Sequence, residues 1–334
     1  MTSTIQETPF TKSVGISYPL ICGAMYPCTN IELVAAVSEA GGIGVIQPLS
    51  IIYAQKQDLR ASLKKLRQLT QKPYGFNILC EASSKVYLER MRGWVKIALE
   101  EGCRFFVTAL GNPKEFVEQV KPYGAIVYHD VTERKWAEKA SLSGVDGFIC
   151  VNNRAGGHTG NQDPKSLWES LHDLGKPLVC AGGVGDEKTF LEMLAMGYAA
   201  VQMGTRYIAT TECYAHQDYK QAIVNSHEAD IVLTDKISGV PVSVIRTPYV
   251  DQMGTHAGGM ARAFLRHPKL KHWMRLLYTL RSMYQLKKAT QSGSSYRDYW
   301  QAGKSVETIH AIESAGVITQ RMGEAWLNQV PTSL

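Results

Sequence analysis

The segment 152–160 (NNRAGGHTG) contains one histidine with glycines on both sides. Glycines leave the imidazole of His158 little side-chain cover and let the backbone present it to a bound molecule. The unperturbed pKa of histidine is about 6.5, so this ring could take up or release a proton near neutrality. A histidine that only caps a loop is the alternative, but the flanking glycines favour a catalytic role for His158.

Two glycine-rich segments follow, AGGVGD at 181–186 and MGTR at 203–206. Glycine lets a backbone approach an anion closely, and the amides that begin a helix carry partial positive charge toward it. Tight turns without a ligand are the alternative for a single such segment. The two segments together favour a phosphate site. Its candidate residues are Ala181, Gly182, Gly183, Gly204 and Thr205.

Three weaker signals come from other apolar runs. Ala24 and Met25 lie in a turn of small residues, GAMYP, where a flat ring could stack close to the backbone. Asn77 ends an apolar run, and its amide can bond the polar edge of a ligand. His129 also ends such a run, and for it a satisfied buried histidine is the alternative interpretation.

Eight short apolar runs must position these residues. They are apolar on successive positions, which indicates strands buried on both faces, as in a parallel sheet covered by helices. The predicted strands are 18–23, 43–47, 74–79, 104–108, 125–129, 147–151, 177–181 and 199–203.

Helical patterns alternate with these strands. They are 30–40, 56–70, 86–101, 113–121, 132–142, 165–173, 186–195 and 211–224. Thr29-Asn30 and Asp186 are placed to cap two of these helices. Eight strands, each followed by a helix, predict an α/β fold of the (β/α)8 TIM-barrel type, with a doubly wound open sheet as the rival. In a barrel, the loops after the strands build the active site, and the glycine-rich segments and His158 lie in such loops.

The pattern changes after residue 225. Residues 229–250 predict short strands or a loop excursion, 258–286 an amphipathic helix, and 289–296 a polar linker, with a last helix from about Ser305. The chain is therefore expected to carry an inserted or appended, mainly helical C-terminal subdomain. The predicted domains are the barrel at 1–225, the excursion and basic helical subdomain at 226–300, and a returning C-terminal helix at 301–334.

Composition and charge describe a globular chain with one unusual segment. The 334 residues are 45% hydrophobic and 20% charged, with a net charge of +6. Segment 252–297 contains nine Lys/Arg and no acid, so the rest of the chain is mildly acidic. A basic segment with aromatics could bind nucleic acid or an anionic surface. Packing of its apolar stripe on the barrel is favoured, so no nucleic-acid partner is expected. The segment could instead cover the site or form a homodimer contact.

The seven cysteines are scattered and show no zinc-ligand spacing, so no metal site is expected. Those in apolar runs are interpreted as buried hydrophobes in a reducing compartment. The N-terminal residues do not resemble a signal peptide, and no run of 18 apolar residues exists. These features predict a cytoplasmic protein that does not enter a membrane.

Four segments carry a resemblance to a known family: GAMYP, AGGHTG, CAGGVGD and VQMGTRYIATTE, with a weaker echo in YWQAG at 299–303. Over about residues 15–250 the sequence resembles the nitronate monooxygenases, once called 2-nitropropane dioxygenases. The same superfamily contains flavin-dependent enoyl-acyl carrier protein reductases. The resemblance implies a TIM barrel that holds FMN non-covalently.

The resemblance also assigns roles to the candidate residues. The phosphate of FMN would lie on the glycine-rich turns, and Ala24, Met25 and Asn77 near its ring. His158 would be the base for neutral nitroalkanes or the partner of a bound nitronate, with dioxygen reoxidising the flavin. The implied cofactor-binding residues are Ala24, Met25, Asn77, Gly156, Gly157, Ala181, Gly182, Gly183, Gly204 and Thr205.

The sequence departs from the family pattern at three places. It has Val151-Asn152-Asn153-Arg154 where members usually carry glutamine-glycine-x-glutamate, Asp130 where a lysine is common, and Lys304 where a glutamine is common. An anionic nitronate needs a positive neighbour, which Arg154 or Lys304 could supply. His129, Arg154 and Lys304 are thus candidate substrate residues. The alternative function is an NAD(P)H-dependent enoyl thioester reductase, and the non-enzymatic one is binding through 252–297.

Overall fold

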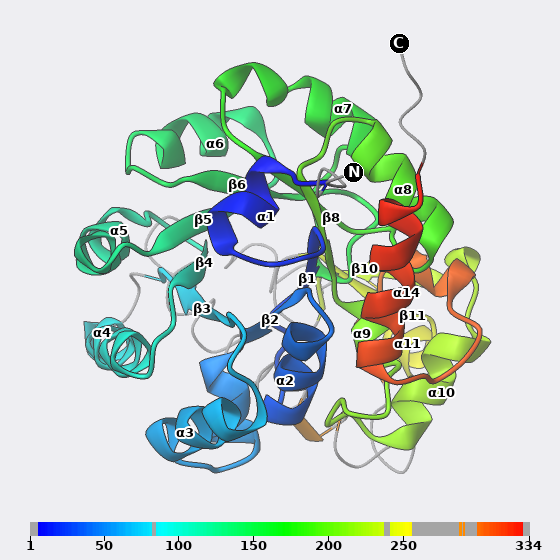
Figure 1. Cartoon of the computed structure of the whole chain (residues 1–334). Coiled ribbons are helices and arrows are strands. Elements are labelled where there is room, and N and C mark those ends of the chain that lie inside the picture. The colour runs from blue at the N-terminus through cyan, green and yellow to red at the C-terminus, as the bar shows by residue number, and fades with distance from the viewer. Residues whose placement is uncertain are drawn as a thin grey trace, which may run out of the picture.

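Eight parallel strands close into a barrel at the centre of the molecule (Figure 1). The computed structural model describes residues 6–81, 85–236, 241–255, 287, 288, 290 and 299–329. The barrel strands are β1 Leu20–Cys22, β2 Ile43–Ile46, β3 Gly75–Leu79, β4 Phe105–Ala109, β5 Ile126–Val131, β6 Gly147–Val151, β8 Leu178–Ala181 and β9 Ala200–Met203. Pairing of β1 with both β2 and β9 closes the ring, which confirms the TIM barrel and excludes the open sheet.

Helices surround the strands, as the alternating pattern predicts (Figure 1). They are α2 Ile31–Glu39, α3 Leu59–Leu69, α4 Lys85–Glu100, α5 Lys114–Val120, α6 Arg134–Ser141, α7 Pro164–Glu169, α8 Glu187–Ala195, α9 Thr205–Ile208 and α10 Gln217–Asn225. The helix expected from residue 211 begins only at Gln217, because residues 211–216 are not helical.

One of the two expected caps forms. Asp186 Oδ1 accepts a hydrogen bond from the backbone N–H of Thr189 at 2.9 Å, so it caps α8. The cap expected from Thr29-Asn30 does not form: Asn30 is the N-cap residue of α2, but its side chain makes no cap bond. Its amide donates instead to Glu32 and to the carbonyl oxygen of Glu212, which ties the start of α2 to the chain after α9.

Aromatic side chains fill the amino-terminal part of the barrel interior. Helix α1 (Pro9–Val14) lies across this opening and inserts Phe10, which is fully buried. The ring of Phe10 packs edge-to-face on Phe105 at 5.5 Å and on Tyr128 at 5.4 Å between centroids. The interior at this end is therefore apolar and closed.

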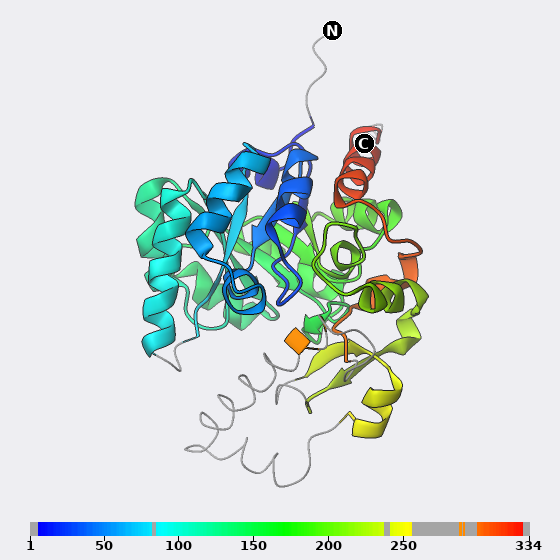
Figure 2. The same cartoon turned by 90° about the horizontal axis from the view of Figure 1, so that it is seen from below.

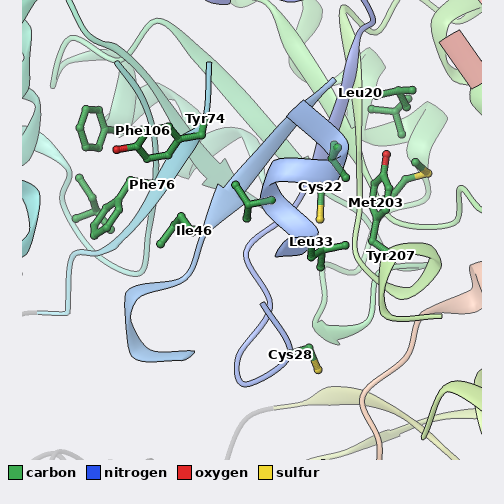
Figure 3. Close-up of a cluster of buried hydrophobic side chains, with 14 of the residues drawn as sticks. Leu20, Cys22, Cys28, Leu33, Ile46, Tyr74, Phe76, Phe106, Met203 and Tyr207 are labelled. Carbon is green, nitrogen blue, oxygen red and sulfur yellow. The ribbon is translucent and has the colours of Figure 1, made fainter. Parts of the chain in front are cut away.

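The opposite faces of the same strands pack against the helices. Figure 3 shows part of this second cluster, including Leu20 on β1, Ile46 on β2 and Leu33 on α2. Helix α2 approaches β2 so closely that a Cβ on Gly44 would lie 2.6 Å from Val34 Cα. The contact is backbone against backbone, so glycine at this position sets the helix–strand distance.

A small antiparallel sheet lies at the other end of the barrel, away from α1 (Figure 2). It consists of β10 (Ile231–Thr234), β11 (Val242–Ile245) and β7 (Gly157–His158). The predicted excursion at 229–250 thus contains two strands, followed by α11 (Pro248–Met253). The predicted helix at 258–286 and linker at 289–296 lie outside the described residues, apart from residue 290, and the domain boundaries stay predictions.

The chain returns to the barrel after residue 299. The last helix, α14, spans Ala315–Leu327 and packs on α2 and α8. The expected start near Ser305 is wrong, because a 3-10 turn, Lys304–Thr308, occupies that position. In the part of the chain that the structure describes, no helix is both long and apolar enough to cross a membrane.

We expect Gly44→Ala to destabilise the fold, because neither backbone at this contact can move without shifting a whole element. A loss of roughly 1–3 kcal/mol, typical of overpacking, should be seen in urea unfolding. Gly93 on α4 is exposed, and no atom lies within 4 Å of the position that a Cβ would take there. Gly93→Ala should therefore stabilise the protein slightly. Equal effects of the two substitutions would contradict the proposed contact.

Candidate functional site

Strand alternation decides which side chains face the barrel interior. Tyr128 on β5 packs among the interior aromatics, so Asp130, two residues on, faces the same way. On β3 and β9 the register likewise places Asn77 and Gln202 inward. The interior thus changes from aromatic at the amino-terminal end to polar near the carboxyl ends of the strands.

Asn77 belongs to a pair of buried amides. Its Oδ1 accepts from Nε2 of Gln47 at 3.0 Å, and its Nδ2 donates to the carbonyl oxygen of Val107 at 3.2 Å. Gln47 Oε1 in turn accepts from the backbone N–H of Leu49. These bonds fix the orientation of the Asn77 amide, which the structure places in the middle of β3 and not, as the sequence suggests, at the end of an apolar run.

Gln202 is half-buried, and its Oε1 is a buried atom that has no hydrogen-bond partner in the described residues. A Cβ on Gly23 would lie 3.0 Å from its side chain, so the glycine makes room for it. A buried oxygen without a partner is costly and rare in native proteins. It indicates that a polar molecule completes this part of the site.

Gly182 and Gly183 form a cradle after β8. Both have positive φ, +121° and +86°, which side-chain-bearing residues rarely adopt. A Cβ on Gly182 would lie 2.5 Å from the backbone N of Ala155 and from Asn152 Oδ1. Asn152 donates to the carbonyl oxygen of Gly182 at 3.0 Å, so it ties the loop after β6 to the cradle.

The loop after β9 completes this group of turns. Gly303 N donates to Thr205 Oγ1 at 2.9 Å, and Gly303 also packs against the backbone of Gly156. A Cβ on Gly204 would lie 3.5 Å from Met25 Sδ. The late segment at 299–303 thus joins predicted cofactor residues from the loops after β6 and β9.

The remaining cofactor candidates are Ala24, Ala181 and Gly157. Ala181 belongs to the interior cluster, and Ala24 packs against it. Gly157 has φ +68°, and a Cβ there would lie 3.0 Å from Gln301 Oε1. All three lie in or beside the carboxyl-end turns.

His158 lies on β7, where it pairs with Val242 of β11. The antiparallel pairing makes β7 part of the small sheet that lies at the end of the barrel opposite α1 (Figure 2). The side chain reaches solvent, yet the surrounding protein desolvates the ring enough to lower its pKa from the ordinary value. The imidazole is therefore neutral over a wider pH range, which suits a proton acceptor.

His129 lies on the face of β5 opposite to the one that carries Asp130. Its Nδ1 is 2.8 Å from Thr108 Oγ1, and burial lowers its pKa to about 4. The structure thus gives His129 the surroundings of a satisfied buried histidine, on the side of β5 that faces the helices. The inward position belongs to its neighbour, Asp130.

Arg154 and Lys304 share one acid. Glu228 accepts from Arg154 Nη2 at 2.5 Å and lies 3.1 Å from Lys304 Nζ. Burial opposes ionisation of Glu228, but these two cations outweigh it and lower the pKa of the carboxyl. Arg154 also packs over Gly183, since a Cβ there would meet its Nε at 2.7 Å. Arg154 therefore lies beside the glycine cradle, and the single carboxylate of Glu228 leaves the two cations with a net positive charge.

Sequence reasoning missed Gln47, Gln202 and Glu228. The sequence could have identified Gln202 as a candidate site residue, because it precedes Gly204 by two residues at the end of a predicted strand. Gln47 could have been identified in the same way, because it is a polar residue that directly follows a run of apolar strand residues. Glu228 has no local signal, since its partners lie 74 and 76 residues away along the chain.

The fold and these turns define a TIM-barrel enzyme whose site is built by the carboxyl-end loops. Comparison with known proteins is more specific. The sequence model "Nitronate monooxygenase" matches residues 7–318, so the chain belongs to the nitronate monooxygenase family of flavin oxidoreductases.

Individual relatives have different activities. The chain is 29% identical over 283 residues to a Mycobacterium tuberculosis (3aS,4S,5R,7aS)-5-hydroxy-7a-methyl-1-oxo-octahydro-1H-indene-4-carboxyl-CoA dehydrogenase, covering 83% of this chain and 77% of that protein. It is 30% identical to a probable nitronate monooxygenase of Staphylococcus haemolyticus, covering 75% and 81%. The structure of FabK from Thermotoga maritima superposes with a TM-score of 0.79 at 28% identity, covering 96% of both chains.

Asp130 generates a prediction about stability. Burial raises the pKa of its carboxyl to about 7, from about 3.9 in an unfolded chain. Its stabilising contribution is thus complete below pH 4 and is lost as pH rises through 7. Asp130→Asn should therefore raise the free energy of unfolding of the ligand-free protein at pH 8, by at most about 4 kcal/mol, and less at pH 5. Urea titrations at both pH values measure this.

Asp173→Asn provides the matched control. Asp173 is exposed, and its hydrogen bond to Arg134 lowers the pKa of its carboxyl. Its replacement should not stabilise the protein at pH 8. A stability change of Asp130→Asn that is the same at both pH values would contradict the assigned burial cost.

Proposed function

We propose that the chain binds FMN at the carboxyl end of its barrel. The observation that carries this proposal is the pair of turns after β8 and β9, where Gly182 and Gly183 expose backbone at positive φ beside Gly204. Such turns suit a phosphate group. The unpartnered oxygen of Gln202 and the amide of Asn77 suit the polar edge of the flavin ring. The residues present therefore fit this cofactor.

We further propose that the protein oxidises alkyl nitronates, with dioxygen as the terminal oxidant. Bound FMN would supply the redox chemistry, accepting electrons from the substrate and passing them to dioxygen. The neutral imidazole of His158 would accept the proton from the carbon beside the nitro group of a neutral nitroalkane. With a nitronate already formed, the same ring would hydrogen-bond the substrate.

Reduction of an enoyl thioester by NAD(P)H is the second candidate. One observation favours it: Arg154 and Lys304 are both paired with Glu228, so a small anion would have to compete with this carboxylate for either cation. Similarity to FabK and to a carboxyl-CoA dehydrogenase agrees with a thioester substrate.

The visible absorption spectrum of the purified protein tests the cofactor and then separates the two reactions. Flavin bands should be present or appear after addition of FMN. Anaerobic bleaching by a nitronate, but not by NADH or NADPH, would support nitronate oxidation. Bleaching by a nicotinamide, reversed by an enoyl thioester, would support the second candidate. A protein that takes up no FMN would contradict both.

His158→Ala should lower kcat/KM for a neutral nitroalkane by about 100-fold or more, because the proton acceptor is lost. The wild-type rate should fall as pH decreases through a pKa below the ordinary histidine value, since protonation removes the base. His172, exposed and stacked on Trp168, is a matched control, and His172→Ala should keep full turnover. Full activity of His158→Ala would remove the assigned role.

Gly182→Ala should weaken FMN binding by at least about tenfold, because the new Cβ would displace the loop that carries Ala155 and Asn152. Gly175 is the control: it also has positive φ, +66°, but no atom lies within 4 Å of its Cβ position. Gly175→Ala should cost stability but leave the FMN dissociation constant unchanged. Titration of each protein with FMN, followed by flavin fluorescence, measures both.

A further inference from the structure

Asp130 is an interior acid that the proposed function does not use. It occupies an inward position near the carboxyl end of β5, paired in register with Ile149 of β6. The turns proposed to hold FMN lie at this end of the barrel. Asn77 and Gln202 face the same barrel interior, from β3, two strands away from β5, and from β9, three strands away.

The carboxyl of Asp130 lacks a partner for one of its oxygens. Oδ1 is buried and makes no hydrogen bond within the described residues. Burial alone accounts for the rise of its pKa to about 7, and no cation in those residues lowers it. An unpaired carboxylate in such a place would be costly, so the carboxyl is largely protonated below pH 7 and ionises as the pH rises through 7.

The ionisable groups around Asp130 do not change this conclusion. Two thiols, Cys80 after β3 and Cys150 on β6, interact electrostatically with Asp130, whose negative charge adds to burial in raising their pKa. Burial, followed by Glu115 and Asp130, raises the pKa of Cys80 to about 12, and burial chiefly raises that of Cys150. Both thiols are therefore neutral. His129 faces the other side of β5 and is neutral as well.

A protonated carboxyl at Asp130 differs chemically from the other unpartnered group of the barrel interior, the side-chain oxygen of Gln202. It offers an O–H donor, whereas a carboxylate only accepts hydrogen bonds. The unpartnered oxygen of Gln202 can only accept. A flavin ring has carbonyl oxygens and ring nitrogens that accept, as well as one imide N–H that donates. Asp130 and Gln202 together therefore offer the two complementary kinds of partner.

We propose that Asp130 binds the flavin in its protonated form and donates a hydrogen bond from its carboxyl to an acceptor atom of the ring. The inference rests on the proposed binding of FMN. It adds a cofactor contact made by the residue that stands in place of the family's common lysine. Because loss of the proton turns this donor into a charged acceptor, flavin affinity falls as the carboxyl ionises.

Binding of FMN to the flavin-free protein between pH 5 and pH 9 tests this inference. The wild-type dissociation constant should rise at least about tenfold as pH passes through 7, equivalent to about 1.4 kcal/mol. Asp130→Asn keeps an N–H donor and cannot ionise, so its affinity should lack this step and match wild type at low pH. Asp130→Leu removes the donor and should bind about tenfold more weakly at pH 6.

Comparison with Asp130→Asn removes other titrations, including that of the FMN phosphate, because they are common to both proteins. Infrared spectroscopy supplies a readout that does not depend on activity. Wild type at pH 6 should show the C=O stretch of a protonated carboxyl that shifts when FMN binds, and Asp130→Asn should lack it.

Identical pH profiles for wild type and Asp130→Asn, with FMN bound by both, would overturn this inference and leave the proposed function intact. If Asp130→Leu bound FMN at pH 6 as tightly as wild type does, the inference would likewise be overturned and the proposed function would stand. Failure of wild type to bind FMN at any pH would overturn both proposals. Asp173→Asn, on the surface, should follow the wild-type profile throughout.

Discussion

The alternation of side chains along eight closed, parallel strands is the constraint on which this structure depends. Every second residue must face the interior, and a barrel of this size has room only for side chains that fit together. Phe10, Phe105 and Tyr128 fill the amino-terminal part. Asn77, Asp130 and Gln202 follow nearer the carboxyl ends of their strands. The same geometry that builds the core thus delivers polar groups to one end.

The second constraint is close backbone packing among the carboxyl-end turns. Gly156, Gly182 and Gly303 each lie where a Cβ would overlap the backbone of another loop. Segments from β6, β8 and the chain after residue 299 are therefore interlocked without intervening side chains. His158 is held differently, by strand pairing with β11. Strand pairing therefore positions the imidazole of His158, whereas close backbone packing positions the glycine cradle.

Much of the fold was predictable because its signals are local. Successive apolar positions mark strands buried on both faces, and all eight predicted strands form. Asp186 caps its helix as expected, since the motif needs only residues three apart. The errors arose where distant contacts compete. Asn30 gives its amide to Glu212, and the segment near Ser305 forms a 3-10 turn packed against Gly185.

By itself, the sequence determined the strand and helix order, the glycine-rich turns and the exposure of His158 between glycines, because each depends on neighbours along the chain. Only the tertiary structure decided which side chains share the interior. It placed His129 toward the helices and Asp130 inward, paired both Arg154 and Lys304 with Glu228, and joined β11 to β7. Register, burial and long-range charge pairing belong to the folded chain, since they arise from residues far apart in sequence.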